Sequence, residues 1–135
     1  MDKLFDVELV TPQRVEFTGK AVSVSCPGIE GRFQVLYNHA PFLSALTVGL
    51  LNLERAGETA LVYAVSGGVV QVFHNHVRIL ADTAERSDSI DVVRATKAKE
   101  RAEARLKSHA QDMDSARAEA ALHRALNRLK AAGRA

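Results

Sequence analysis

The sequence predicts a mainly β protein with a helical end. An N-terminal antiparallel β-sandwich, residues 1–86, precedes a C-terminal antiparallel two-helix hairpin, residues 87–135. Up to residue 81, short runs alternate apolar and polar residues and are separated by glycine or proline, which is typical of antiparallel sheets. From residue 82 to residue 132 there is neither glycine nor proline, and alanine and arginine recur at helical spacing. We call the two parts the head and the tail.

Nine runs in the head have strand character, and residues that favour turns separate them. The runs are residues 5–10, 14–17, 21–26, 32–37, 42–48, 50–55, 59–65, 69–73 and 76–81. Turns are expected after each run, notably at residues 18–20, 27–31, 49, 56–58 and 66–68. Many short strands at this spacing favour a sandwich or barrel of about 80 residues.

A charged, polar segment at residues 82–89 separates the head from the tail. The first helix is expected to begin near Ile90, with Asp88 or Ser89 as its N-cap and Asp91 close to the positive end of the helix dipole. Asp112 or Asp114 is expected to cap the second helix.

Each tail helix has a stripe of small residues at intervals of three and four. The stripes are Ala95, Ala98, Ala102 and Leu106, then Ala118, Leu122, Ala125, Leu129 and Ala132. Small residues let two helices pack closely, but alanine buries little apolar area at ~25 cal/mol per Å². The hairpin is therefore expected to be only marginally stable without the head, a ligand or a partner.

Composition excludes several classes of protein. The single cysteine, Cys26, rules out an internal disulfide and suits a reducing compartment. No apolar run approaches the ~20 residues of a membrane-spanning helix. The N-terminus resembles neither a secretory signal nor a transit peptide, so we expect a soluble chain of cytoplasmic type.

Charge is distributed unevenly between the two parts. Residues 1–89 have 7 basic and 10 acidic residues, whereas residues 90–135 have 11 basic and 6 acidic residues. The basic side chains include two arginine triplets with the same spacing: Arg94, Arg101 and Arg105, then Arg117, Arg124 and Arg128. Guanidinium groups at such positions share a helical face and suit phosphates or carboxylates. The alternative is an ordinary solvated surface, but the acidic residues are too few to pair with every base.

Signals for catalysis are weak. The chain has no Gly-x-x-x-x-Gly-Lys-Ser/Thr motif, and no nucleophile, base and orienting residue can be assembled. His74 and His76 could share a metal-binding face but have no third ligand at suitable spacing. We therefore predict a binding and regulatory protein without catalytic residues, without a metal site and without a catalytic cofactor.

The ordered motifs of the head resemble the epsilon subunits of F-type ATP synthases. These motifs are residues 31–43 (GRFQVLYNHAPFL), Gly49, residues 66–68 (SGG) and residues 81–85 (ADTAE), and the resemblance covers the whole chain. It implies a sandwich of about ten strands that binds the gamma subunit and the membrane c-ring, with Arg32 and His39 facing the ring. It also implies a tail that inhibits ATP hydrolysis when it extends toward the alpha and beta catalytic subunits.

The first tail helix matches the ATP-binding branch of that family from Ile90 to Leu106, as Ile-Asp-x-x-Arg-Ala-x-x-Ala-x-x-Arg-Ala-x-x-Arg-Leu. The resemblance implies ATP as a regulatory ligand that favours the folded hairpin, and leaves a need for magnesium open. The implied contacts are Glu85, Ile90, Asp91, Arg94, Ala95, Arg101, Arg124 and Arg128. The implied location is peripheral, on the cytoplasmic face of the bacterial plasma membrane, without membrane insertion.

Two other classes of function predict different observations. A stand-alone nucleic-acid-binding module would use the basic tail and bind DNA or RNA in a salt-dependent way. The acidic head and the absence of stacking aromatic residues from the tail argue against it. A small esterase or metalloenzyme would use His39 or the pair His74 and His76, but no triad or ligand set accompanies them.

Overall fold

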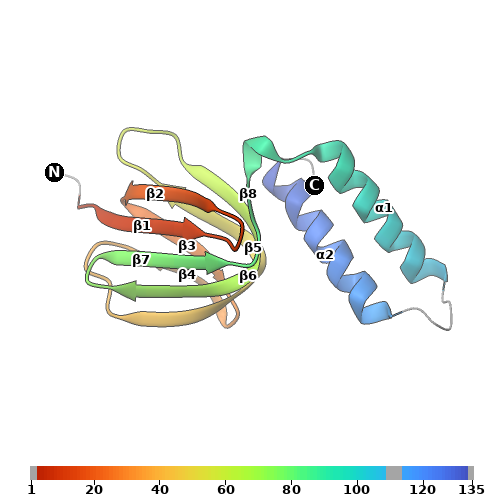
Figure 1. Cartoon of the computed structure of the whole chain (residues 1–135), viewed down its shortest axis with the longest axis horizontal. Coiled ribbons are helices and arrows are strands. Elements are labelled where there is room, and N and C mark those ends of the chain that lie inside the picture. Colours follow the sequence, from red (N-terminus) through yellow and green to blue (C-terminus); the bar gives the residue numbers. More distant parts are fainter. Residues whose placement is uncertain (1–2, 109–113, 134–135) are drawn as a thin grey trace. The chain divides into compact units, whose positions relative to one another are not determined.

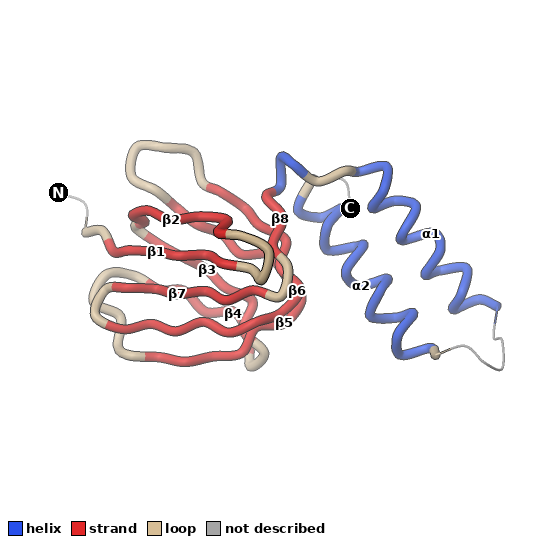
Figure 2. Tube along the Cα trace, viewed as in Figure 1, coloured by secondary structure: helices blue, strands red, loops and turns tan. Residues whose placement is uncertain are grey.

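The computed structural model describes residues 3–108 and 114–133. Within these ranges there are eight strands, one 3-10 turn and two α-helices (Figures 1 and 2). They are β1 (Phe5–Val10), β2 (Val15–Ala21), β3 (Ser23–Gly28), β4 (Gly31–Val35), β5 (Phe42–Glu54), β6 (Leu61–Phe73), β7 (His76–Ala81), β8 (Ala84–Arg86), η1 (Ser87–Ser89), α1 (Val92–Ser108) and α2 (Ser115–Ala131). The chain forms two compact units, Met1–Arg86 and Ser87–Ala135.

The first unit is a single sheet folded into two layers. Its strand order is β2-β1-β7-β6-β5-β3-β4, and β8 also pairs with β6. The start of β6 pairs with β8 and its end pairs with β7, so this long strand contributes to both layers. Strand β5 pairs with β6 along almost its whole length and bends with it. The mainly β class with two C-terminal helices is therefore confirmed.

The number of strands differs from the expected ten because two predicted turns are bends within continuous strands. Gly49 lies inside β5, and Gly67 and Gly68 lie inside β6. At Gly68, with φ of 134°, a Cβ atom would lie 2.1 Å from the carbonyl oxygen of Leu80. Glycine is required there because the two backbones approach too closely for a side chain.

Three other strand predictions need correction. Strand β2 continues through residues 18–20, where a turn was expected. Strand β8 lies within the charged, polar segment that was expected to separate the head from the tail. Strands β1 and β7 pair in parallel, so the sandwich is not wholly antiparallel.

The core of the head lies between the two layers and consists mainly of aliphatic side chains, together with Phe5 and Tyr63. Leu9, Leu51, Leu53 and Ile79 are completely buried, and Tyr63 is the largest buried side chain. The Tyr63 hydroxyl donates to the carbonyl oxygen of Glu16 at 3.5 Å.

The second unit is an antiparallel pair of 17-residue helices (Figure 1). The buried residues of the helices are Ala95, Ala102, Ala118, Ala125 and Leu129, which confirms the small-residue seam. The predicted start of the first helix was two residues too early, because residues 87–89 form the 3-10 turn η1. Asp91 caps α1 instead of Asp88 or Ser89, and its Oδ1 accepts from the Arg94 backbone N–H at 3.0 Å.

The cap of the second helix is Asp114, whose Oδ1 accepts from the Arg117 backbone N–H at 3.1 Å. The other candidate, Asp112, lies outside the described residues.

Candidate anion-binding face and docking surfaces

The two arginine triplets lie on one face of the helical hairpin. A helix turns by about 100° per residue. Arg94, Arg101 and Arg105 therefore lie about 80–120° to one side of the buried seam of α1, and the second triplet has the same offset from the seam of α2. In an antiparallel pair, equal offsets in the same sense place both triplets on the same face. We call these six residues the arginine face.

Acidic side chains of the helices lie on the opposite face of the hairpin. Glu100, Glu103 and Glu119 are displaced from their seams in the other sense, by about 80–140°. Lys99, Lys107 and Lys130 are displaced in the same sense as these glutamates, whereas no glutamate of the two helices lies among the arginines. The arginine face therefore carries positive charge without interleaved glutamates, which favours an anionic partner for it.

The arginines of this face are available for a ligand. Five of them are exposed, whereas Arg128 is half-buried. Across residues 3–108 and 114–133, no carboxylate lies within 4 Å of the guanidinium groups of Arg94, Arg101, Arg105, Arg117 or Arg124. Their charges repel one another in the folded hairpin, and a bound polyanion would relieve that repulsion.

The remaining predicted contacts with ATP have different structural roles. Asp91 is exposed, and its carboxylate is used as the cap of α1. Ala95 is completely buried in the seam and Ile90 is 9% exposed. Glu85 belongs to the other compact unit, where it pairs with Ala64 at the edge of β6.

The two predicted ring contacts lie at opposite ends of the segment that contains β4. Arg32 is near the start of β4, and its Nη1 donates to the carbonyl oxygen of Leu50 at 2.7 Å. His39 follows the end of β4, where its ring meets Phe42 edge-on with a centroid separation of 5.8 Å. Arg32 is exposed to solvent, whereas His39 is half-buried.

An apolar row on the outer surface of the head was not predicted from the sequence. Val10, Leu80, Val69 and Ala45 are register partners across four neighbouring strands, in the order β1-β7-β6-β5. Leu80 is 51% exposed and Val69 is 40% exposed. Each residue lies at an outward position of an alternating strand, but only the strand order shows that they adjoin. A row of this kind is typical of a protein-binding surface.

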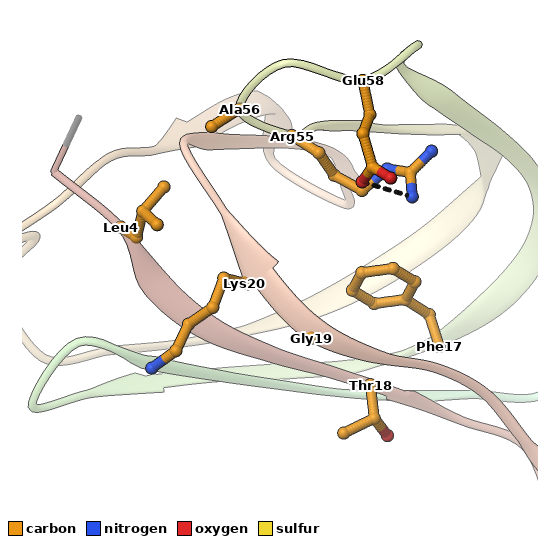
Figure 3. A pocket seen from close by; sticks show the side chains of 8 residues that line it. All are labelled: Leu4, Phe17, Thr18, Gly19, Lys20, Arg55, Ala56 and Glu58. Carbon is orange, nitrogen blue, oxygen red and sulfur yellow. Dashed lines mark ion pairs between the residues drawn. The ribbon is translucent and has the colours of Figure 1, made fainter.

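A crevice of about 290 Å³ lies between β2 and the hairpin that follows β5 (Figure 3). Its cations already have partners: Arg55 lies 2.9 Å from Glu58, and Lys20 lies 2.7 Å from Asp6. No residue predicted to bind a ligand lines it. The crevice therefore offers little free charge to a ligand.

Reactive and metal-binding side chains are sparse in the described parts of the chain. Burial raises the pKa of the Cys26 thiol to about 12, so the thiol stays protonated and unreactive at neutral pH. Among the described residues no three His, Cys, Asp or Glu side chains are placed to hold a metal ion. None of the helices in those residues is long and apolar enough to cross a membrane.

A β-sandwich with an outer apolar row, followed by a hairpin with a cationic face, offers two surfaces that suit binding partners. Two family models divide the chain within one residue of the boundary between the two compact units. The ATP synthase delta/epsilon chain β-sandwich domain matches residues 4–87, and the long α-helix domain of the same chain matches residues 88–133.

Curated relatives match over the full length. The ATP synthase epsilon chain of Desulforamulus reducens is 47% identical and covers 98% of this chain and 99% of its own. The epsilon chain of Nitratidesulfovibrio vulgaris strain DP4 is also 47% identical, with complete coverage of both. The chain therefore belongs to the ATP synthase delta/epsilon chain family, and as an epsilon chain it is a non-catalytic subunit of the rotary complex.

Solved structures agree with this assignment. One is a cryo-EM structure of the Euglena gracilis mitochondrial ATP synthase comprising OSCP, F1 and the c-ring, with a TM-score of 0.83 and 25% identity. The match covers 96% of this chain and 81% of that one. The central stalk and c-ring structure from Tetrahymena thermophila, at 19% identity and a TM-score of 0.68, shares the fold.

Proposed function

We propose that this chain is the regulatory epsilon subunit of a bacterial F-type ATP synthase, and that its tail is a switch controlled by ATP. The folded hairpin binds ATP, whereas the extended tail inhibits ATP hydrolysis by the complex. The observation that carries the proposal is the arginine face, which lacks carboxylate partners for five of its six guanidinium groups within the described residues.

The arginine face fits a triphosphate chemically. Guanidinium groups donate paired hydrogen bonds to phosphate oxygens and keep their charge at any physiological pH. Arg94, Arg101, Arg124 and Arg128 would bind the phosphates. Ile90 would adjoin the adenosine, whereas Ala95, which is completely buried in the seam, would act by letting the two helices pack closely. Asp91 and Glu85 would contact the adenosine or orient the arginines, and Asp91 already fixes the first turn of α1.

The alanine seam suits a switch because it stabilises the folded state only weakly. Two states must lie within a few kcal/mol for a ligand to select between them. A ligand at 100 times its dissociation constant stabilises the state that it binds by ~2.7 kcal/mol. ATP would neutralise the arginine face in the folded state, whereas acidic segments of the alpha and beta subunits would do so in the extended state.

The head would join the rotor parts of the complex. The apolar row Val10, Leu80, Val69 and Ala45 offers an outer surface for the gamma subunit, since apolar side chains at an exposed sheet face are stabilised by a protein partner. Arg32 and His39 would contact the polar loops of the membrane c-ring. These contacts would hold the subunit peripherally at the cytoplasmic face of the bacterial membrane, where it serves proton-driven ATP synthesis.

Calorimetry with ATP tests the ligand site. Arg101→Ala should weaken ATP binding by ~1.5–3 kcal/mol, the usual value of a charge-assisted hydrogen bond. Lys107→Ala is the matched control, because it removes one positive charge from an exposed position of α1 on the face opposite the arginines. If both variants lose the same affinity, ATP binding reflects net charge alone and the site is wrong.

Truncation tests the switch. ATP synthase assembled with residues 1–89 should synthesise ATP but hydrolyse it faster than the complex with the full chain, most clearly at low ATP. Raising ATP should reduce the difference, because ATP shifts the full chain toward the folded hairpin. Equal hydrolysis rates at every ATP concentration would show that the tail does not inhibit.

A further inference from the structure

Among residues 3–86, three residues that are not glycine have positive φ angles. They are Asn38 at 62°, His74 at 47° and Asn75 at 58°. Asparagine tolerates this region better than other side chains, whereas histidine at such an angle is uncommon. His74 and Asn75 form the turn between β6 and β7, with positive φ at both positions as in a type I′ hairpin. Asn38 lies 37 residues earlier in the chain, between β4 and β5.

The two asparagine side chains join these distant turns. The Asn38 backbone N–H donates to Asn75 Oδ1 at 2.6 Å, and Asn75 Nδ2 donates to Asn38 Oδ1 at 3.0 Å. The Asn75 carbonyl oxygen also accepts from the Asp6 backbone N–H at 3.0 Å. Asn75 therefore connects the segment before β5, the β6–β7 turn and strand β1.

The segment held in this way is residues 36–41. Its internal backbone hydrogen bond runs from the His39 N–H to the Leu36 carbonyl oxygen, at 3.1 Å. Leu36 is 51% exposed and Tyr37 is 39% exposed, so burial contributes little to fixing them. The hydrogen bonds between Asn38 and Asn75 supply a long-range restraint, together with the Lys3 ammonium that lies 5.8 Å from the centre of the Tyr37 ring. His39 directly follows Asn38, the residue that these hydrogen bonds hold.

We propose that Asn38 and Asn75 form a clamp that sets the shape of residues 36–41 and so positions His39 for docking to the rotor. This inference rests on the proposed contact between His39 and the c-ring. Asn75 acts through the segment and is a positioning residue.

Aspartate substitutions separate the clamp from the shape of each turn, since aspartate also tolerates positive φ. In Asn38→Asp the new carboxylate still accepts from Asn75 Nδ2, and the backbone N–H still donates to Asn75 Oδ1. In Asn75→Asp the amide of Asn38 can turn over and donate to the new carboxylate. The double variant has two carboxylates facing each other and no side-chain donor.

Hydrogen exchange in the intact chain measures the clamp directly. The exchange protection of the residue-38 amide should stay within about threefold of wild type in each single variant. In the double variant at pH 7 it should fall by about tenfold or more, because the hydrogen bond from Asn75 Nδ2 to Asn38 Oδ1 is lost and the two carboxylates repel each other. Protection of the Val70 amide in β6 should be unchanged, which shows that the head remains folded. Unchanged protection of residue 38 in the double variant would overturn the clamp.

Reassembly with ATP synthase that lacks this subunit measures docking. His39→Ala and the double variant should both weaken assembly by at least about fivefold, whereas the two single aspartate variants should assemble like wild type. If His39→Ala weakens assembly and the double variant does not, the clamp does not position His39 and the inference is wrong. If His39→Ala has no effect, the proposed ring contact fails, and the exchange experiment still decides whether the clamp exists.

Discussion

The head and the tail bury side chains of different size. In the head, Leu51, Leu53 and Ile79 are completely shielded from solvent, and full burial of such a side chain contributes ~1.5–3 kcal/mol. Four of the five residues buried in the tail helices are alanines. Burying the methyl group of one alanine contributes only ~0.8 kcal/mol.

The head is therefore stabilised by burial more strongly than the tail. The head has enough buried apolar area to keep its docking surfaces in one arrangement without a ligand. The tail combines a weak seam with a face on which six arginines repel one another. Under the proposed function, this weak seam would let a ligand or partner of modest affinity decide which state of the tail is populated.

The strongest test of this comparison shortens one buried leucine in each part. Leu51→Ala should lower the free energy of unfolding of the head by about 2–5 kcal/mol, because it leaves a cavity in a packed core. Leu129→Ala, in the tail, should cost less because the narrow hairpin can close around the missing atoms. Denaturation followed by β-sheet and helix signals would report the two parts. Equal losses would mean that the tail is packed as firmly as the head.

A second test concerns the bend that makes two layers from one sheet. Gly68→Ala should destabilise the head by about 2–3 kcal/mol, since its Cβ would meet the Leu80 carbonyl oxygen at 2.1 Å and φ is 134°. Gly57→Ala is the matched control, because its φ is 70° and nothing lies within 4 Å of the added atom. Its cost should be about 1 kcal/mol, from backbone strain alone. Thermal unfolding measures both variants. If Gly68→Ala and Gly57→Ala lose similar stability, the close approach of the Leu80 carbonyl oxygen is not the reason for glycine at position 68.

Glycine explains where prediction from sequence failed in the head. The same residue favours a turn between two strands and a bend inside one strand, and local composition does not separate the two. Residues 66–68 and Gly49 were interpreted as turns, although they are bends in β6 and β5. Pairing partners far along the chain decide the outcome. For Gly67 they include Asp82, whose N–H donates to the Gly67 carbonyl oxygen at 3.0 Å.

The arginine face was predictable because helical spacing is local. Both triplets and both seams could be assigned from intervals of three, four and seven residues. The apolar row on the head and the Asn38–Asn75 pair were not predictable, because each depends on which strands adjoin. The cap of α1 was misplaced because a 3-10 turn and an α-helix have similar local sequence preferences.

A third test addresses the marginal stability of the tail. Asp114→Ala removes the side-chain acceptor for the Arg117 N–H and should cost about 1 kcal/mol. Asp114→Asn keeps an acceptor oxygen at the same position and should cost little. Because the hairpin is weakly stable, the alanine variant should show a visible loss of helix by circular dichroism at 37 °C. No difference between the two variants would indicate that the cap contributes nothing to the fold of the tail.

The smallest expected effect concerns a surface pair of the head. The Lys20 ammonium donates to the Asp6 carboxylate at 2.7 Å, and this hydrogen bond lowers the pKa of Asp6 below its ordinary value of 3.8. A carboxylate with a lowered pKa in the folded state stabilises that state at neutral pH, and the contribution is lost as pH falls through the folded pKa. Asp6→Asn should therefore be slightly less stable than wild type at pH 7, and the two should converge near pH 2. Added salt should also reduce the difference, because both groups are exposed to solvent.

Glu30→Gln is the control, since Glu30 is exposed and has no ion pair among the described residues of the chain. Urea midpoints at pH 7 and pH 2 would measure each variant. If Asp6→Asn and Glu30→Gln differ from wild type equally, the effect is one of net charge, and the pair contributes nothing to the stability of the sandwich.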